Sequence, residues 1–183
     1  LIVADGYGAF LHCEAPEQAR WRARAALLTA ALMSGAMQAA LDLTQQYTAD
    51  RQQFGKPLAA FQAVQHQLAA MVGQVAACGV AVQAGARELD ETGNLLPAAI
   101  AKARTSDLVR PIVATAHQLH GAMGFTQEYR LQEYTKCLLA WRDQYGNELN
   151  WHEWLGRQAL RAGGTGTWAL IAADDSTYRI PQA

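Results

Sequence analysis

The stretch Tyr47–His66 combines an arginine, three aromatic residues and several amides around a break in helical periodicity. Upstream apolar residues recur at helical spacing, Gly55 and Pro57 interrupt the pattern, and the spacing resumes from Phe61. Arg51 is therefore expected where one long helix ends. A guanidinium group offers phosphate oxygens a rigid fork of donors, so an arginine at a helix junction could grip a phosphate-bearing cofactor. The residues alone favour a plainer interpretation, a tight interhelical turn with a solvated arginine.

Two histidines and a group of tryptophans are weaker candidates for a site. His117 and His120 are three residues apart, which places them on one helical face at a spacing that a metal could use. No cysteine or carboxylate pair completes a ligand set, so we predict no metal site. Trp141, Trp151 and Trp154 lie near arginines, but a chain with a net charge of −1 lacks the basic footprint of a nucleic-acid surface. Packing in a bundle or at an interface explains them better.

The composition is that of one domain able to bury a sizeable core around these residues. Of 183 residues, 51% are hydrophobic and 17% are charged. No run of about eighteen uninterrupted apolar residues occurs, and no basic segment followed by a long apolar block opens the chain, so we expect neither a membrane span nor a signal peptide. Cys13, Cys78 and Cys137 are scattered among apolar residues, which predicts buried, reduced thiols and a cytoplasmic protein.

Helical signals dominate from Ala15 onward. Helices are expected at about 15–51, 59–89, 97–120, 131–142 and 148–160. Pro111 falls inside the third of them and should kink it or mark a local break, because proline lacks the amide donor. Long helices with short connections predict an all-α fold, an antiparallel up-and-down four-helix bundle.

The two ends of the chain differ from its middle. Residues 1–14 are β-branched and apolar and are interrupted by Asp5-Gly6 and Gly8, which predicts a short strand or hairpin that ends a preceding β domain. The bundle itself is expected to span 15–162. Residues 163–183 begin with Gly-Gly-Thr-Gly-Thr and are expected to form a flexible tail, or to dock on a partner through Trp168 and Ile171.

Two motifs resemble those of a known family. Asp50-Arg-Gln-Gln-Phe-Gly-Lys-Pro-Leu58, followed by Phe61-Gln62, resembles the signature that joins the first two helices of the C-terminal domain of acyl-CoA dehydrogenases. Gln118-Leu-His-Gly-Ala-Met-Gly-Phe-Thr-Gln-Glu-Tyr129 resembles the Gly-rich turn after that domain's third helix. Two motifs in the right order are more specific than either alone, and the resemblance extends roughly over 15–154. The chain is identified as a member of this family.

The resemblance implies a fold, a cofactor and a reaction. In these enzymes an N-terminal helical domain and a middle β-barrel precede the helical C-terminal domain, so this chain is expected to begin in the last strands of the barrel and to be a fragment. The family uses FAD for α,β-dehydrogenation of an acyl-CoA thioester. The isolated fragment is expected to be inactive, because the barrel holds the flavin ring and most of the thioester site.

The first motif implies three cofactor contacts. The arginine that matches Arg51 contacts the diphosphate of an FAD bound mainly by the neighbouring subunit. The aromatic residue that matches Phe54 packs by the flavin, and the amide that matches Gln62 helps to hold the adenosine half.

The second motif implies three more cofactor contacts. Gln118 matches a glutamine that contacts the adenine-diphosphate portion, with the backbone of Gly121 and Ala122 alongside. The family usually has a second glycine where Ala122 stands, so an added methyl group approaches the ligand there. Glu128 and Tyr129 belong to a turn that we interpret as structural, because it aims the next segment at the active site.

The catalytic base of the family is not found at its usual positions. A carboxylate must remove the α-proton, and it has to be desolvated, with its pKa raised towards the working pH. Most members carry a glutamate after the second motif, and counting without gaps from Glu128 places Tyr145 there. Other members carry it early in the first helix, where the count from Tyr47 gives Ala25. A phenol is ordinarily protonated at neutral pH and makes a poor base.

Three explanations of the missing base are open. In the first explanation, the alignment with the family slips by a few residues, so that Glu148 or Asp143 serves as the base. In the second explanation, the chain is the non-catalytic partner in a hetero-oligomer and contributes flavin contacts while another subunit supplies the base, as in mixed complexes that act on sterol side-chain thioesters. In the third, the chain is a degenerate, purely structural relative. We favour the second.

The rival from another functional class is a helical interaction module without flavin. Both hypotheses predict a homo- or hetero-oligomer, a dimer or a tetramer, because a bundle of such apolar helices should pair. An acyl-CoA is the expected substrate of the full-length protein, and neither nucleic acid nor a membrane is expected as a partner. A flavin spectrum separates the two hypotheses.

Overall fold

The structure is a computed structural model that describes residues 2–5, 8–11 and 15–172. Its α-helices are α1 (Ala15–Asp50), α2 (Gln62–Glu91), α3 (Leu96–His120), α4 (Leu131–Arg142) and α5 (Glu148–Ala172). The short elements are the strands β1 (Ile2–Asp5), β2 (Gly8–Leu11), β3 (Gln52–Gln53) and β4 (Lys56–Pro57), and the 3-10 turns η1 (Leu58–Ala60) and η2 (Gly121–Phe125).

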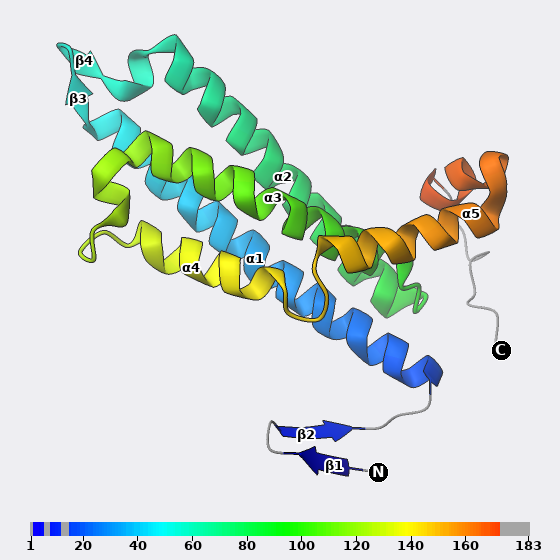
Figure 1. The fold of residues 1–183 in the computed structure, drawn as a ribbon. Coiled ribbons are helices and arrows are strands. Elements are labelled where there is room, and N and C mark those ends of the chain that lie inside the picture. Colours follow the sequence, from blue (N-terminus) through cyan, green and yellow to red (C-terminus); the bar gives the residue numbers. More distant parts are fainter. Residues whose placement is uncertain (1, 6–7, 12–14, 173–183) are drawn as a thin grey trace.

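The helices form an up-and-down bundle in which α3 contacts α1, α2, α4 and α5. Figure 1 shows α1, α2, α3 and α4 running in alternating directions, with α4 and α5 following one another along the bundle. The predicted all-α, antiparallel four-helix fold is confirmed. β1 pairs with β2 in an antiparallel register that sets Ile2 opposite Leu11, which confirms the short β remnant before α1.

Small residues on α1 allow the helices to approach closely. Ala26, Ala30, Ala36 and Ala40 are all buried at helical spacing along α1. Alanine is also the best helix former, so these positions favour the helix locally and its packing globally. Thr44 and Thr48 continue the buried face, and their hydroxyl groups donate to backbone carbonyls one turn earlier, which satisfies them without a tertiary partner.

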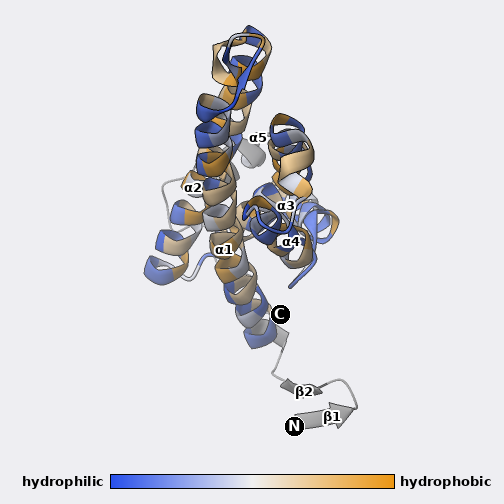
Figure 2. Ribbon diagram, turned by 90° about the vertical axis from the view of Figure 1, so that its left-hand side faces the viewer, coloured by the Kyte–Doolittle hydropathy of each residue, from blue (hydrophilic) through white to orange (hydrophobic). Residues whose placement is uncertain are grey.

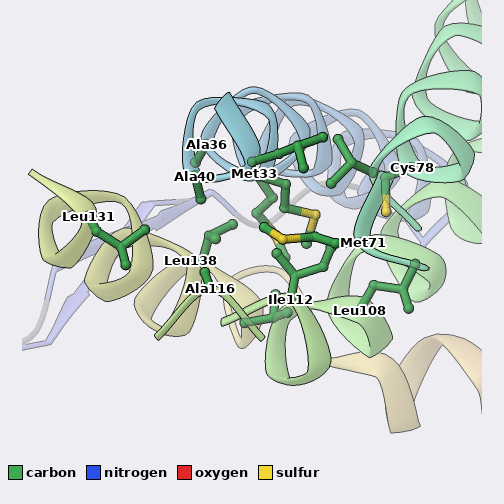
Figure 3. Packing of buried hydrophobic residues seen from close by; sticks show 14 residues of the cluster. Met33, Ala36, Ala40, Met71, Cys78, Leu108, Ile112, Ala116, Leu131 and Leu138 are labelled. Atoms are coloured by element: carbon green, nitrogen blue, oxygen red, sulfur yellow. The ribbon is translucent and has the colours of Figure 1, made fainter. Parts of the chain in front are cut away.

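The larger of the two core clusters fills the end of the bundle that carries the β3–β4 connection. Met33, Met71, Ile112 and Leu138 come from four different helices and are fully or almost fully buried. Figure 3 shows Met33, Met71 and Ile112 converging in its centre. Methionine fills such irregular gaps because its side chain is unbranched and flexible. The core therefore holds α1, α2, α3 and α4 as one unit.

The structure differs from the predicted helices at two places. α3 runs through Pro111 as one continuous helix, so a local break there was wrong. The buried residues on both sides of the proline, Val109 and Ile112, belong to the same core cluster, which anchors both parts of the helix. α5 extends to Ala172 with a non-helical Gly163 (φ 73°) inside it, so the first part of the predicted flexible tail is helical. The side chains of Trp168 and Ile171, and all of Cys13, lie outside the described residues.

Two helices are long and apolar enough, by length and composition alone, to cross a membrane. These segments are Glu17–Asp50 in α1 and Gln62–Glu91 in α2. Within the apolar window of each helix, 50% of α1 and 22% of α2 are buried in the bundle. Buried core helices meet the same criteria, which accounts for α1. α2 differs, because only 22% of its window is buried; Figure 2 shows hydrophilic and hydrophobic residues mixed along it.

Candidate functional site

A two-residue hairpin separates α1 from α2 where the sequence predicts the helix junction. β3 and β4 pair antiparallel, and the two residues between them, Phe54 (φ 52°) and Gly55 (φ 80°), both have left-handed backbone. Positive φ at both positions fits the type I′ turn, which matches the twist of the strands. Glycine adopts it freely, whereas Phe54 is strained by its Cβ. The hairpin projects beyond the bundle (Figure 1) and leaves Phe54 91% exposed.

Arg51 sits at the base of this hairpin with its backbone fixed and its side chain free. Its N–H donates to the carbonyl of Tyr47 at 2.8 Å, and its own carbonyl accepts from the N–H of Leu58 at 2.9 Å. The side chain is exposed, and none of the described residues forms an ion pair or a hydrogen bond with its guanidinium group. A fork of five donors is thus held at the end of the bundle without a partner in this part of the chain.

The hairpin tip adds a second cation and a second aromatic ring. Lys56 Nζ lies 4.3 Å from the centroid of the Phe61 ring, and the edge of Phe54 meets Phe61 with 6.3 Å between ring centroids. Cation–π contact holds the ammonium group beside the tip while leaving its charge in solvent. Gln62 follows as the first residue of α2 and is exposed. The tip therefore offers positive charge, ring faces and an amide together.

The end of α3 carries the second set of predicted cofactor residues. Gln118 and Ala122 are exposed, and Gly121 ends the helix with φ 58° and ψ −140°, a conformation that favours glycine. Its N–H donates to the carbonyls of Gln118 and His117. No atom lies within 4 Å of the place that a Cβ on Gly121 would take. The backbone is open to approach from outside at this glycine.

A buried aromatic cluster ties the two sets of residues together. Tyr47, one turn before Arg51, stacks on the ring of His120 at 4.5 Å, and Tyr129 lies 5.0 Å from His120. His120 Nδ1 lies 2.8 Å from the carbonyl of Ala116, so this nitrogen carries the proton, and Nε2 accepts from the Tyr129 hydroxyl at 3.3 Å. Burial lowers the pKa of His120, with partial compensation by backbone carbonyls, which keeps the ring neutral.

His117, one turn before the end of α3, contacts other residues than His120 does. Its ring stacks on Phe125 at 4.4 Å, and Nε2 lies 3.0 Å from the Thr135 hydroxyl. Burial lowers the pKa of His117. Within the described ranges, no group of three or more His, Cys, Asp or Glu side chains could hold a metal ion.

The turn between α4 and α5 contains the position predicted for the catalytic base. Tyr145 (φ 56°) and Gly146 (φ 103°) are consecutive residues with positive φ, and the Tyr145 side chain is exposed. Glu148 is largely buried and forms an ion pair with Arg142. Burial by itself raises the pKa of Glu148. The pKa is lowered by a larger amount through hydrogen bonds from its own amide and from Arg142 and through nearby arginine charges, so the net shift is downward. A carboxylate held as an anion in this way is a poor proton acceptor.

The other two base positions offer no better acceptor within this chain. Asp143 is exposed and lies 3.5 Å from Arg142, so it lacks desolvation. Ala25 is half-buried on α1 and has no titratable group. Arg22, one turn earlier, has Nη2 3.0 Å from the place that a Cβ on Gly146 would take. The start of α1 and the α4–α5 turn thus lie close together, and neither of the two predicted base positions carries a carboxylate.

The identity of the bundle follows from comparison with known proteins. The model of the acyl-CoA dehydrogenase C-terminal domain matches residues 22–142. This span contains both motifs, the hairpin and the aromatic cluster, and it covers more than half of the chain. The chain belongs to the acyl-CoA dehydrogenase family.

Individual members of the family show how much of such a protein this chain represents. It is 37% identical over 112 residues to the acyl-CoA dehydrogenase IpdE2 of Mycolicibacterium smegmatis, covering 61% of this chain and 35% of that protein. The structure of butyryl-CoA dehydrogenase from Megasphaera elsdenii superposes with a TM-score of 0.76 at 27% identity, over 84% of this chain and 40% of that one. The structure of the steroid ACAD (acyl-CoA dehydrogenase) Tcur3481–Tcur3483 superposes with a TM-score of 0.71 at 28% identity, over 74% of this chain and 38% of that one. The chain spans about a third of the length of the curated relatives it matches.

The acyl-CoA dehydrogenase match stops short of the α4–α5 turn. It ends at Arg142, three residues before Tyr145, so the assignment of Tyr145 to the glutamate position stays a prediction. The six residues predicted to contact the cofactor fall inside the match and share one property: all are exposed at the same end of the bundle, namely Arg51, Phe54, Gln62, Gln118, Gly121 and Ala122. Their side chains and open backbone fit a diphosphate and a planar ring system, which need cationic and amide donors and an aromatic neighbour.

The motifs did not reveal Lys102, which is fully buried. A sequence signal for it exists: Lys102 shares the helical face of Ala98, Val109 and Ile112, which are buried residues on α3. A single lysine on an apolar face usually extends its head group to water. This one does not.

Proposed function

We propose that the chain is the helical C-terminal part of an FAD-dependent acyl-CoA dehydrogenase and that it contributes contacts to a cofactor bound mainly by a neighbouring subunit. The observation that carries the proposal is the exposed guanidinium of Arg51, which has no partner among the described residues and whose backbone is fixed at the base of the hairpin that carries Phe54. When bound, FAD supplies the acceptor for the hydride that leaves the β-carbon of the thioester. In this chain Arg51 would hold the diphosphate, and Gln62 and Gln118 would donate to the adenosine half.

We further propose that the chain does not supply the catalytic base. Counting from the two motifs places Tyr145 and Ala25 at the usual base positions of the family, Glu148 is paired with Arg142, and Asp143 is exposed. A non-catalytic subunit in a hetero-oligomer explains these features together. The name of the similar steroid ACAD pairs two proteins, Tcur3481 and Tcur3483, which supports this arrangement. An acyl-CoA, with either a fatty-acyl or a sterol-derived acyl group, is the proposed substrate of the assembled enzyme, and the cytoplasm is its proposed location.

The test of this assignment is activity with and without a partner. The 183 residues alone should not reduce an artificial electron acceptor with any acyl-CoA, because they contain neither usual base and span only about a third of their relatives. Reduction of the acceptor by this chain alone would overturn the proposal. A helical interaction module would instead give a stable complex that shows no flavin absorption.

The exposed face of α2 is the proposed oligomer interface. Val72 and Val80 are 40% and 68% exposed, and the exposed Ala69, Gly73 and Ala76 lie between or beside them on the same helical face. Apolar stripes of this kind mark interaction surfaces.

Val80→Glu should therefore raise the dissociation constant of the oligomer tenfold or more, since a charge buried without a partner costs more than the 1.4 kcal/mol that a factor of ten requires. Ala114→Glu, at an exposed position on α3, is the matched control and should leave the oligomer intact. Light scattering at micromolar concentration measures both variants. A monomeric wild-type protein, or equal effects of the two substitutions, would exclude this interface.

A further inference from the structure

The C-terminal end of α4 lacks the usual cap. Many helices end with a glycine or asparagine in left-handed conformation whose amide returns to the last carbonyls. Here Asp143 follows α4 with right-handed dihedrals (φ −89°, ψ −12°). The carbonyl of Trp141 accepts from the amides of Asp143 and Gln144. The carbonyl of Arg142, the last residue of α4, accepts no hydrogen bond from a backbone amide of the described residues.

Lys102 supplies the missing donor from another helix. Its Nζ lies 2.7 Å from the carbonyl oxygen of Arg142, 2.8 Å from the Ser106 hydroxyl oxygen and 3.5 Å from the carbonyl oxygen of Trp141. An ammonium group has three N–H donors, and three oxygens surround it here. Ser106 also donates to the Arg142 carbonyl at 3.3 Å. A cation is favourable at this place, because the C-terminus of a helix carries partial negative charge.

This arrangement opposes the preference of lysine for water. The side chain is fully buried, and burial lowers the pKa of Lys102 to about 8, while Asp143 and Glu148 oppose the shift and Arg142 adds to it. A residue that only filled this space would be served better by methionine or leucine, which carry no charge to desolvate. The specific contacts to α4 are what the lysine adds.

The segment that follows α4 depends on where this helix ends. Tyr145 and Gly146 both have positive φ. For Tyr145, which has a Cβ, this conformation persists only when its surroundings fix it. One side of the turn is fixed by the ion pair between Arg142 and Glu148. Lys102 binds the carbonyl of the same Arg142, so both the side chain and the backbone of this residue are held.

We propose that Lys102 is a positioning residue: by capping α4 from α3, it fixes the turn of residues 143–147, where the family resemblance predicts the position of the catalytic base. The conformational part of this inference stands on the contacts above. Its consequence for catalysis rests on the proposed function.

Hydrogen exchange in the purified protein tests the conformational part. Lys102→Met keeps the length of the side chain but removes the donors, and it should accelerate exchange tenfold or more in a peptide covering 139–151. Peptides from α2 should stay within twofold of wild type. Val75→Ala, a core substitution on α2, is the control. It should accelerate exchange in peptides from α2, and it should affect the peptide covering the turn no more than peptides from the rest of the chain. Uniform acceleration by Lys102→Met, or an unchanged turn, would overturn the proposal.

A milder substitution covers the case in which Lys102→Met does not fold. Ser106→Ala removes one of the three acceptors and the second donor to Arg142, and it should accelerate the same peptide about threefold. No change in that peptide would overturn the proposal as well. The exchange experiment needs neither cofactor nor substrate. A wild-type complex without flavin would therefore count against the proposed function and not against the role of Lys102.

Discussion

Arg51→Ala is expected to lower FAD retention by the assembled protein tenfold or more. Charge-assisted hydrogen bonds contribute about 1.5–3 kcal/mol each, and 1.4 kcal/mol corresponds to a factor of ten. The unfolding midpoint of the chain should barely move, because the guanidinium group has no partner among the described residues and alanine keeps both backbone hydrogen bonds, to Tyr47 and from Leu58. Flavin content after gel filtration, measured by absorption, gives the retention.

Arg87→Ala provides the matched control for this experiment. Arg87 is also exposed and lies near the opposite end of α2, about 37 Å from the start of that helix at 1.5 Å per residue. It should leave both flavin content and stability unchanged. If Arg51→Ala instead unfolds the chain while the flavin content of the complex stays the same, Arg51 is a structural residue and its assignment to the cofactor is wrong.

Leu138→Ala is expected to cost about 2–5 kcal/mol of stability, because the leucine is fully buried in the main core cluster and its removal leaves a cavity. For a chain of this size, such a loss lowers the unfolding midpoint by roughly 5–15 °C. The neighbouring residue offers a control of the same type: Leu139 is 48% exposed, and Leu139→Ala should shift the midpoint by at most about 2 °C. Thermal unfolding followed by circular dichroism measures both.

The comparison of these two leucines tests how α4 is placed. If both substitutions are equally mild, α4 does not pack on α1 and α3 as described, and the positions of the α4–α5 turn and of Lys102 lose their support. If Leu139→Ala is the more damaging one, the helix is rotated about its axis.

The sequence was sufficient for most of the fold, because helical periodicity and breakers act locally. α4 begins and ends at the predicted residues, and α3 begins one residue before the expected start. Pro111 does not break α3, because residues on either side of it pack in one core cluster; the alternative, a kink at this residue, stays a prediction. Gly163 marks a break in α5, as the glycine-rich sequence indicates, but the segment after it returns to helix.

The site was only partly accessible from the sequence. The motifs placed Arg51 and Gln118 in one site through family resemblance, and the stacking of Tyr47 on His120 supplies the physical link between their helices. The cap that Lys102 forms on α4 depends on contacts between residues about forty positions apart, which no local pattern reveals. The left-handed backbone of Phe54 was also missed, because a phenylalanine at such a turn position is unusual.

The flavin content of the protein with and without this chain tests the central claim most directly. The chain should be co-expressed with the products of neighbouring genes, and the partner should also be purified alone. We predict a yellow complex whose ratio of bound FAD to protein, read from its visible absorption, falls at least tenfold when this chain is omitted. A colourless complex, or a partner that retains the same FAD alone, would contradict the claim that this bundle helps to hold the cofactor.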